Sequence, residues 1–171
     1  DAEYIFYKDH PHDRLEFVTP DINPNDIVMF GSFYAINPVI RPQMLAFLEY
    51  AHWKGAILYY DVNYRASHKN EVVKVTANIL ENFELADIIR GSSEDFEVMF
   101  NKKDADSVYR AQIDFYCKNF IYTQGGEPIE FRAKGGIAKQ YAVPDTKTVS
   151  TIGAGDNFNA GFVYGLIKYG V

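Results

Sequence analysis

The chain has 171 residues, of which 47% are hydrophobic and 16% aromatic, enough to bury the core of one globular domain. Its 17 basic and 23 acidic residues give a net charge of −6, and no run of Lys or Arg provides the basic surface that nucleic acid or an anionic membrane requires. We therefore expect a small-molecule partner, with no nucleic acid and no membrane.

The single cysteine and the two chain ends are the next features of the sequence. Cys117 cannot form an internal disulfide, which favours a reducing compartment and hence a cytoplasmic location, and its apolar neighbours are typical of a buried thiol. The chain begins with Asp1 rather than Met and ends on the helical pattern "YGLIKYGV". We therefore expect a fold that is truncated at both ends.

In chain order, apolar and β-branched runs bounded by turn residues predict strands. The predicted strands are 4–8, 27–31, 56–61, 87–91 and 118–123. Between them, apolar side chains recur at intervals of three and four residues and predict helices. The predicted helices are 41–54, 69–84, 94–102 and 105–116. Alternating strands and helices favour βαβ units and a largely parallel sheet.

The pattern changes after "KNFIYTQGGEP". Residues 129–133 and 137–143 form two short alternating segments separated by "KGG", which predicts antiparallel strands at a sheet edge. A last helix is predicted from about residue 154 onward. The expected fold class is therefore α/β, with a mostly parallel sheet and an antiparallel edge. Ligands of such sheets gather at the carboxyl ends of the strands, so motifs at strand ends carry most of the functional information.

The stretch "STIGAGDNFNAG", residues 150–161, can form a turn that holds an anion. Gly153 and Gly155 allow the backbone to turn tightly, and the helix that begins there presents N–H groups and a positive dipole end. The stretch is neither a Walker A loop, because no Lys-Ser/Thr follows, nor a dinucleotide fingerprint, because Phe158 stands at the third glycine position. Asp156 is then either the base of a phosphoryl transfer or an acid that stabilises a helix N-terminus.

The same stretch resembles the C-terminal signature of the ribokinase-like, or PfkB, carbohydrate kinases, which runs Asp-Thr-x-Gly-Ala-Gly-Asp-x-Phe-x-x-Gly. The matching residues are Thr151, Gly153, Ala154, Gly155, Asp156, Phe158 and Gly161. The resemblance implies that Asp156 is the catalytic base that deprotonates a sugar hydroxyl. It also implies that the amides of residues 153–156 form the anion hole for the γ-phosphate of ATP. Ser150 departs from the family, which often has Asp there.

Two further segments resemble substrate-side elements of this family. "YYDVNYR", residues 59–65, is similar to the Asp-Pro-Asn-x-Arg segment of fructokinase-like and 2-keto-3-deoxygluconate kinase-like members, with Val62 in place of the proline. The resemblance implies that Asn63 and Arg65 bind substrate. From the residues alone, Arg65 can equally pair with a neighbouring acid, and Asn63 can simply make the turn.

"YIFYKDH", near the start, resembles the lid-side strand of acid-sugar kinases and fructokinases. The resemblance implies that Tyr7 and Lys8 contact the sugar, although aromatic residues that alternate on a strand commonly serve packing. "HPHD" predicts an exposed loop rather than a metal site at His10 and His12. "FGS", residues 30–32, ends a strand and either lines the sugar pocket or makes a glycine-assisted turn.

The nucleotide-side motifs are present in altered form. "IIRGSSEDFEVMF" resembles the Asn-x-x-Glu element that the family ties to magnesium-bound water and phosphate, which places Ser92 and Asp95, with Glu94 adjacent, near Mg²⁺. Ser92 and Asp95 also fit a helix N-cap. "YTQGGEP" resembles the Thr-x-Gly strand end that supports ATP. The nucleotide-binding residues that the resemblance implies are Ser92, Thr123, Gly125, Thr151, Gly153 and Gly155.

Taken over the whole chain, the resemblance implies a partial ribokinase-like domain with a three-layer αβα core. Residues 1–12 would be a remnant of the lid or substrate-side strand, and residues 25–171 the core with the ATP-side motifs. The implied function is a sugar kinase that uses ATP and Mg²⁺ on fructose or a 2-keto-3-deoxygluconate type of acid sugar, with a possible homodimer through the lid region of the full-length protein. The fragment alone would be inactive. The alternative is a non-catalytic nucleotide-binding or scaffold protein of this fold, in line with Ser150 and the altered acidic element.

Overall fold

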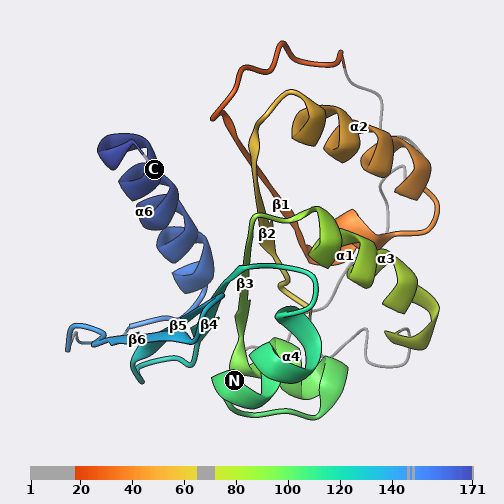
Figure 1. Cartoon of the computed structure of the whole chain (residues 1–171). Helices are drawn as coiled ribbons and strands as arrows, with labels where there is room; N and C mark the ends of the chain where they lie inside the picture. Colours follow the sequence, from red (N-terminus) through yellow and green to blue (C-terminus); the bar gives the residue numbers. More distant parts are fainter. Residues whose placement is uncertain (1–17, 65–71, 146, 148, 171) are drawn as a thin grey trace. The chain divides into compact units, whose positions relative to one another are not determined.

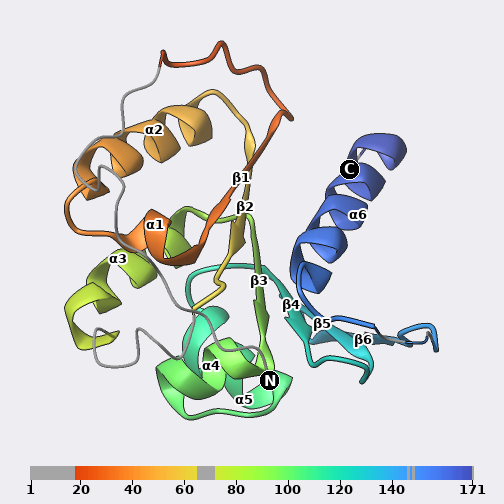
Figure 2. The ribbon, with the colours of Figure 1, turned by 180° about the vertical axis from the view of Figure 1, so that it is seen from behind.

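The computed structural model describes residues 18–64, 72–145, 147 and 149–170 (Figures 1 and 2). The described residues form two compact units, residues 18–143 and residues 144–170. The strand predicted over residues 4–8 lies outside the described residues. None of the helices in the described part of the chain is long and apolar enough to cross a membrane.

Within the described residues of the first unit, six strands form one sheet in the order β1-β2-β3-β4-β5-β6 (Figure 1). The strands are β1 (Ile27–Gly31), β2 (Ile57–Asp61), β3 (Ile88–Ser92), β4 (Asn119–Thr123), β5 (Ile129–Ala133) and β6 (Ile137–Tyr141). Strands β1 to β4 pair in parallel, and β5 pairs antiparallel with both β4 and β6. The predicted α/β class, with a mostly parallel sheet and an antiparallel edge, is confirmed.

Five α-helices lie in the described part of the first unit and one in the second. They are α1 (Ser32–Ile36), α2 (Arg41–Trp53), α3 (Val72–Leu85), α4 (Ser93–Phe100) and α5 (Ala105–Val108), with α6 (Ala154–Tyr169) in the second unit. The helix predicted over 105–116 is confirmed through residue 113, but it is α-helical only in α5 and becomes π-helical at Tyr109–Ile113, and residues 114–116 form a turn. Helix α1 is too short for its apolar period to be visible in the sequence.

The core lies between helices and one face of the sheet. Leu58 and Tyr60 of β2 belong to the buried apolar cluster, whereas Tyr59 points to the opposite face of the sheet, as strand alternation requires. From the helix side, α3 contributes Ile79 and Phe83 to this cluster. Burying side chains of this size stabilises the fold by about 1.5–3 kcal/mol each. This packing fixes the parallel strands, and so places their carboxyl ends along one edge of the sheet.

Candidate active site

A buried arginine joins the carboxyl ends of three neighbouring strands. Arg90 of β3 donates from Nη1 to Asp61 Oδ1, 2.9 Å away at the end of β2, and from Nη2 to Thr123 Oγ1, 2.7 Å away at the end of β4. Arg90 and Asp61 are each only 8% exposed. The strand register places these groups side by side, since Asp61 lies opposite Arg90. We call Asp61, Arg90 and Thr123 the strand-end network.

Asp95 fixes a second set of contacts at the same edge. One carboxylate oxygen accepts hydrogen bonds from the Ser92 backbone N–H at 2.6 Å and the Ser92 hydroxyl at 2.7 Å, and the other accepts from the Tyr64 N–H at 2.6 Å. Ser92 Oγ in turn accepts from the Asp95 N–H at 3.3 Å, which completes a capping box at the start of α4. The predicted N-cap is confirmed. Asp95 also reaches beyond its own helix to the turn that follows β2.

Burial sets the protonation behaviour of Asp95. Desolvation raises the pKa of this carboxyl above its usual range, while the hydrogen bonds from Ser92 and the positive charge of Arg90 act in the opposite direction. In the folded chain, the Asp95 carboxyl group therefore stays protonated up to a higher pH than it does in water.

Asn63, predicted to bind substrate, occupies a turn that is held on both sides. Its φ of 38° lies in the left-handed region, which is uncommon for a residue other than glycine. Before it, the Val62 N–H donates to the Arg90 carbonyl at 2.9 Å, and after it the Tyr64 N–H donates to Asp95. The surrounding contacts therefore keep Asn63 in a strained conformation of the kind that is common at functional sites. Its side chain is half-buried and lies just after the carboxyl end of β2.

Thr123 and Gly125 lie where β4 turns into β5. Gly125 has a φ of 65°, so this turn needs a residue that tolerates the left-handed region. Thr123 accepts a hydrogen bond from Arg90, and its hydroxyl lies 3.5 Å from the Gly91 carbonyl. The structure thus brings the predicted nucleotide-side residues Thr123, Ser92 and Asp95 to adjacent strand ends.

In the second unit, the Gly-Ala-Gly-Asp stretch forms the start of α6. Gly153 is the N-cap, with φ 76° and ψ 4°. The first helical hydrogen bond runs from the Asn157 N–H to the Gly153 carbonyl at 2.9 Å, so the amides of Gly155 and Asp156 precede the intrahelical bonds. The Ala154 N–H instead closes a turn to the Thr151 carbonyl at 3.1 Å.

Asp156 lies in the first turn of α6 and is exposed. Just before the helix, the Ser150 hydroxyl accepts a hydrogen bond from the Ile152 N–H at 3.2 Å and so helps to shape the turn. The predicted helix from residue 154 onward is confirmed. The turn presents a carboxylate beside N–H groups that point along the positive end of the helix dipole.

The comparison with family models decides the assignment. The model for pfkB family carbohydrate kinases matches residues 4–170. The chain belongs to this family. The match covers both compact units and every site residue predicted from the sequence.

Curated relatives and solved structures agree with the family. The chain is 26% identical to a 5-dehydro-2-deoxygluconokinase of Bacillus thuringiensis (strain Al Hakam) and 27% identical to one of Geobacillus thermodenitrificans (strain NG80-2). Each match covers 98% of this chain, but only 53% and 52% of the relatives. The chain therefore spans about half the length of the curated relatives that it matches.

The solved structures show a shared fold. A fructokinase from Vibrio cholerae O395, in a form with fructose, ADP and calcium ion bound, matches with a TM-score of 0.76 over 86% of this chain and 47% of that one, at 21% identity. An aminoimidazole riboside kinase from Salmonella enterica, complexed with aminoimidazole riboside and an ATP analog, matches with a TM-score of 0.71 over 83% and 48%, at 22% identity. The ribokinase-like fold expected from the sequence is thereby confirmed.

Three predicted substrate residues of this family member lie outside the described residues: Arg65, Tyr7 and Lys8. The same holds for His10 and His12. Their roles stay predictions.

Sequence reasoning assigns no role to Arg90, although a signal was present. The segment "DIIRGS" places an arginine inside an apolar strand, and a buried charge needs a partner. Asp61, which ends the preceding strand, was the natural candidate. What the sequence alone could not supply is the register that sets the two opposite each other.

The predicted magnesium element offers no direct set of ligands. Both Asp95 oxygens accept hydrogen bonds from Ser92 and Tyr64, and Glu94 is exposed. Among the described residues, no group of three or more His, Cys, Asp or Glu side chains could hold a metal ion. The part of Glu94 and Asp95 in magnesium binding stays a prediction. Any such ion would be held mostly by nucleotide oxygens and water.

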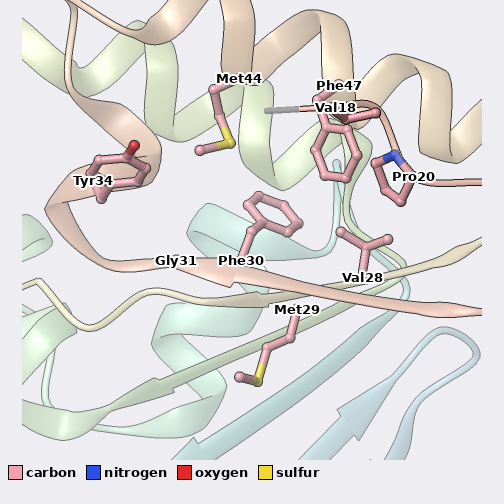
Figure 3. A pocket seen from close by; sticks show the side chains of 9 residues that line it. All are labelled: Val18, Pro20, Val28, Met29, Phe30, Gly31, Tyr34, Met44 and Phe47. Atoms are coloured by element: carbon pink, nitrogen blue, oxygen red, sulfur yellow. The ribbon is translucent and has the colours of Figure 1, made fainter. Parts of the chain in front are cut away.

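The "FGS" strand end lines an apolar cavity. Phe30 and Val28 of β1 face Met44 and Phe47 of α2 across a space of about 500 Å³, whereas Met29 points to the other side of the strand (Figure 3). Among the described residues, no charged side chain lines this cavity and the Tyr34 hydroxyl is its one polar side-chain group, so it offers little of the hydrogen bonding that a sugar requires. The prediction that this strand end lines the sugar pocket gains no support from this cavity.

Proposed function

We propose that the full-length protein containing this chain transfers the γ-phosphate of ATP to a hydroxyl of a sugar or acid sugar. Membership of the carbohydrate kinase family supports the reaction class. The curated relatives are named 5-dehydro-2-deoxygluconokinases, and fructokinases share the fold. The proposed acceptors are therefore acid sugars of the 2-keto-3-deoxygluconate and 5-dehydro-2-deoxygluconate type, with fructose as the second choice.

Asp156 is the proposed base, and the geometry of its turn is the observation that carries the proposal. A left-handed Gly153 caps α6, so that Asp156 lies within one helical turn of amides that precede the first intrahelical bond. Phosphoryl transfer requires donors for the γ-phosphate oxygens and an acceptor for the proton of the attacking hydroxyl. The amides of Gly155 and Asp156 supply the donors, and the Asp156 carboxylate accepts the proton.

The residues of the strand ends take the binding roles in this proposal. Asn63 binds the sugar from its fixed turn, and Arg65 binds a carboxylate or hydroxyl of the substrate. Thr123, Gly125 and Ser92 support the ATP phosphates and ribose. Mg²⁺, when bound to the nucleotide, neutralises the charge of its phosphates.

The 171 residues alone are proposed to be inactive or nearly so. The chain spans about half the length of its curated relatives, and the family resemblance implies that part of the sugar-recognition region belongs to the other half. Much of the rate enhancement of a kinase comes from holding the acceptor hydroxyl against the γ-phosphate. We therefore expect a chain that carries only part of the sugar site to turn over little or no sugar.

The alternative is a scaffold protein of the same fold that binds nucleotide without turnover. Ser150, at a position where the family often has Asp, and the capping role of Asp95 are the observations in its favour. A scaffold has no need, however, for a carboxylate among the amides of a phosphate turn.

The test is ADP release by the longest expressed chain that contains this sequence, with ATP, Mg²⁺ and a panel of sugars. The panel contains 5-dehydro-2-deoxygluconate, 2-keto-3-deoxygluconate, fructose and ribose. Turnover that depends on one of the first three supports the proposal, and the isolated 171 residues serve as the low-activity comparison. Measurable ATP binding without turnover on any sugar would instead support the scaffold reading.

A further inference from the structure

We propose that Arg90 is a positioning residue that couples the substrate-side turn at residues 62–64 to the nucleotide-side strand end at Thr123. This inference rests on the proposed kinase function and goes beyond it, since Arg90 itself does not contact the reacting groups in that proposal. Its part is to hold Asn63 and Thr123 in a fixed relation, so that both substrates bind to one preformed edge.

The bonds of Arg90 run to both sides of its strand. Toward β2, its guanidinium binds Asp61 at 2.9 Å and its carbonyl accepts the Val62 N–H at 2.9 Å. Toward β4, the other arm of the guanidinium binds the Thr123 hydroxyl at 2.7 Å. One residue therefore fixes the chain immediately before Asn63 and the side chain of Thr123.

The planar guanidinium is what makes this coupling possible. Its N–H groups lie in one plane at fixed angles to one another. A shift of Asp61 therefore turns the whole guanidinium and changes the direction in which Nη2 donates to Thr123. Lysine carries the same charge on a single nitrogen with rotatable donors and cannot impose that geometry. Because Arg90 is 8% exposed, water does not replace a lost partner easily.

Arg41 provides a matched control. It is also buried, at 7% exposed, and donates to Glu81 Oε2 at 2.8 Å, to Asn82 Oδ1 at 2.6 Å and to the Ala35 carbonyl at 2.9 Å. These bonds join helices α1, α2 and α3, and none of them reaches a residue proposed to bind substrate. Loss of Arg41 should cost stability in the way that loss of Arg90 does, without changing the site.

The experiment compares Arg90→Lys and Arg90→Met with Arg41→Lys and Arg41→Met in the longest expressed chain. KM for ATP, KM for the sugar, kcat and the melting midpoint are measured, all kinetics well below the lowest midpoint. We expect Arg90→Met to raise both KM values by at least about tenfold, because losing one charge-assisted hydrogen bond changes an equilibrium by about that factor. Compared with Arg90→Met, Arg90→Lys should restore the melting midpoint more fully than it restores the two KM values. The Arg41 variants should lower the midpoint and keep both KM values.

Unchanged KM values in the Arg90 variants would overturn the inference and leave the kinase function standing. So would equal increases in the Arg41 variants, because the effect would then follow general loss of stability. If the wild-type protein shows no turnover, the same variants are compared by the Kd for ADP, where weaker binding in the Arg90 variants alone supports the inference. A wild-type protein with neither turnover nor nucleotide binding overturns both proposals.

Discussion

The strand-end network and the turn at the start of α6 are built in opposite ways. The first consists of charged and polar side chains that bond across three strands: the buried Arg90 with the buried Asp61 and the half-buried Thr123. The second is a glycine-rich turn whose backbone hydrogen bonds join residues three or four positions apart, and its Asp156 is exposed. Substitutions in the network should therefore act mainly on stability and binding, and substitutions in the turn mainly on turnover.

The largest stability effect should follow from breaking the buried ion pair. Asp61→Asn removes the carboxylate that pairs with the buried Arg90 guanidinium, and removing one partner of a buried pair costs about 3–5 kcal/mol of unfolding free energy. Urea unfolding of the purified protein measures this cost. The exposed pair of Lys103 and Glu97 is the control, since Glu97→Gln should cost no more than about 1 kcal/mol. Similar losses in the two variants would contradict the contrast between buried and exposed pairs.

Gly91 tests how tightly α4 is packed against β3. A Cβ at this position would lie 2.5 Å and 2.6 Å from ring atoms of the buried Phe96, so Gly91→Ala must displace the ring and should cost about 1–3 kcal/mol. Gly126→Ala is the matched control, because a Cβ there meets nothing within 4 Å. A Gly91 variant as stable as the Gly126 variant would show that the edge can relax and does not hold its residues rigidly.

In the α6 turn, stability depends mainly on the backbone conformation of one glycine. Gly153 has a φ of 76°, and the nearest atom to an added Cβ is 4.0 Å away, so Gly153→Ala should cost only the left-handed strain of about 1–2 kcal/mol. Gly153→Asn should recover part of this cost, because asparagine tolerates that region better. Thermal melting of both variants checks the order. An alanine variant that melts no lower than the asparagine variant would mean that the turn does not need a left-handed residue.

The pH dependence of Asp95 should be the smallest effect. Burial raises its pKa above the ordinary value of 3.8, so the folded chain favours the neutral acid. That contribution is fully present below pH 3.8 and is lost as the pH rises through the raised value. The unfolding free energy of the wild type, minus that of Asp95→Asn, should therefore fall as the pH rises above 3.8. Urea unfolding at several pH values tests this. A difference that rises instead would mean that the hydrogen bonds from Ser92 outweigh burial.

Local features of the site could be predicted from the sequence, whereas its long-range contacts could not. The capping pair Ser92 and Asp95 and the start of α6 follow from residues a few positions apart, and the structure has both. The bond from Tyr64 to Asp95 joins residues 31 positions apart, and its existence depends on strand register and helix packing. The sequence also did not predict the π-helical turn at Tyr109–Ile113, because the apolar residues of this segment keep the spacing of an ordinary α-helix.

The most direct test of the account is the turnover of Asp156→Asn in the longest expressed chain, measured as sugar-dependent ADP release beside the wild type. If Asp156 is the base, kcat should fall by about 10²–10⁴-fold while the melting midpoint stays close to that of the wild type, because the carboxylate is exposed. Retention of near wild-type kcat by Asp156→Asn would contradict the assignment of the base, and with it the central claim about the α6 turn.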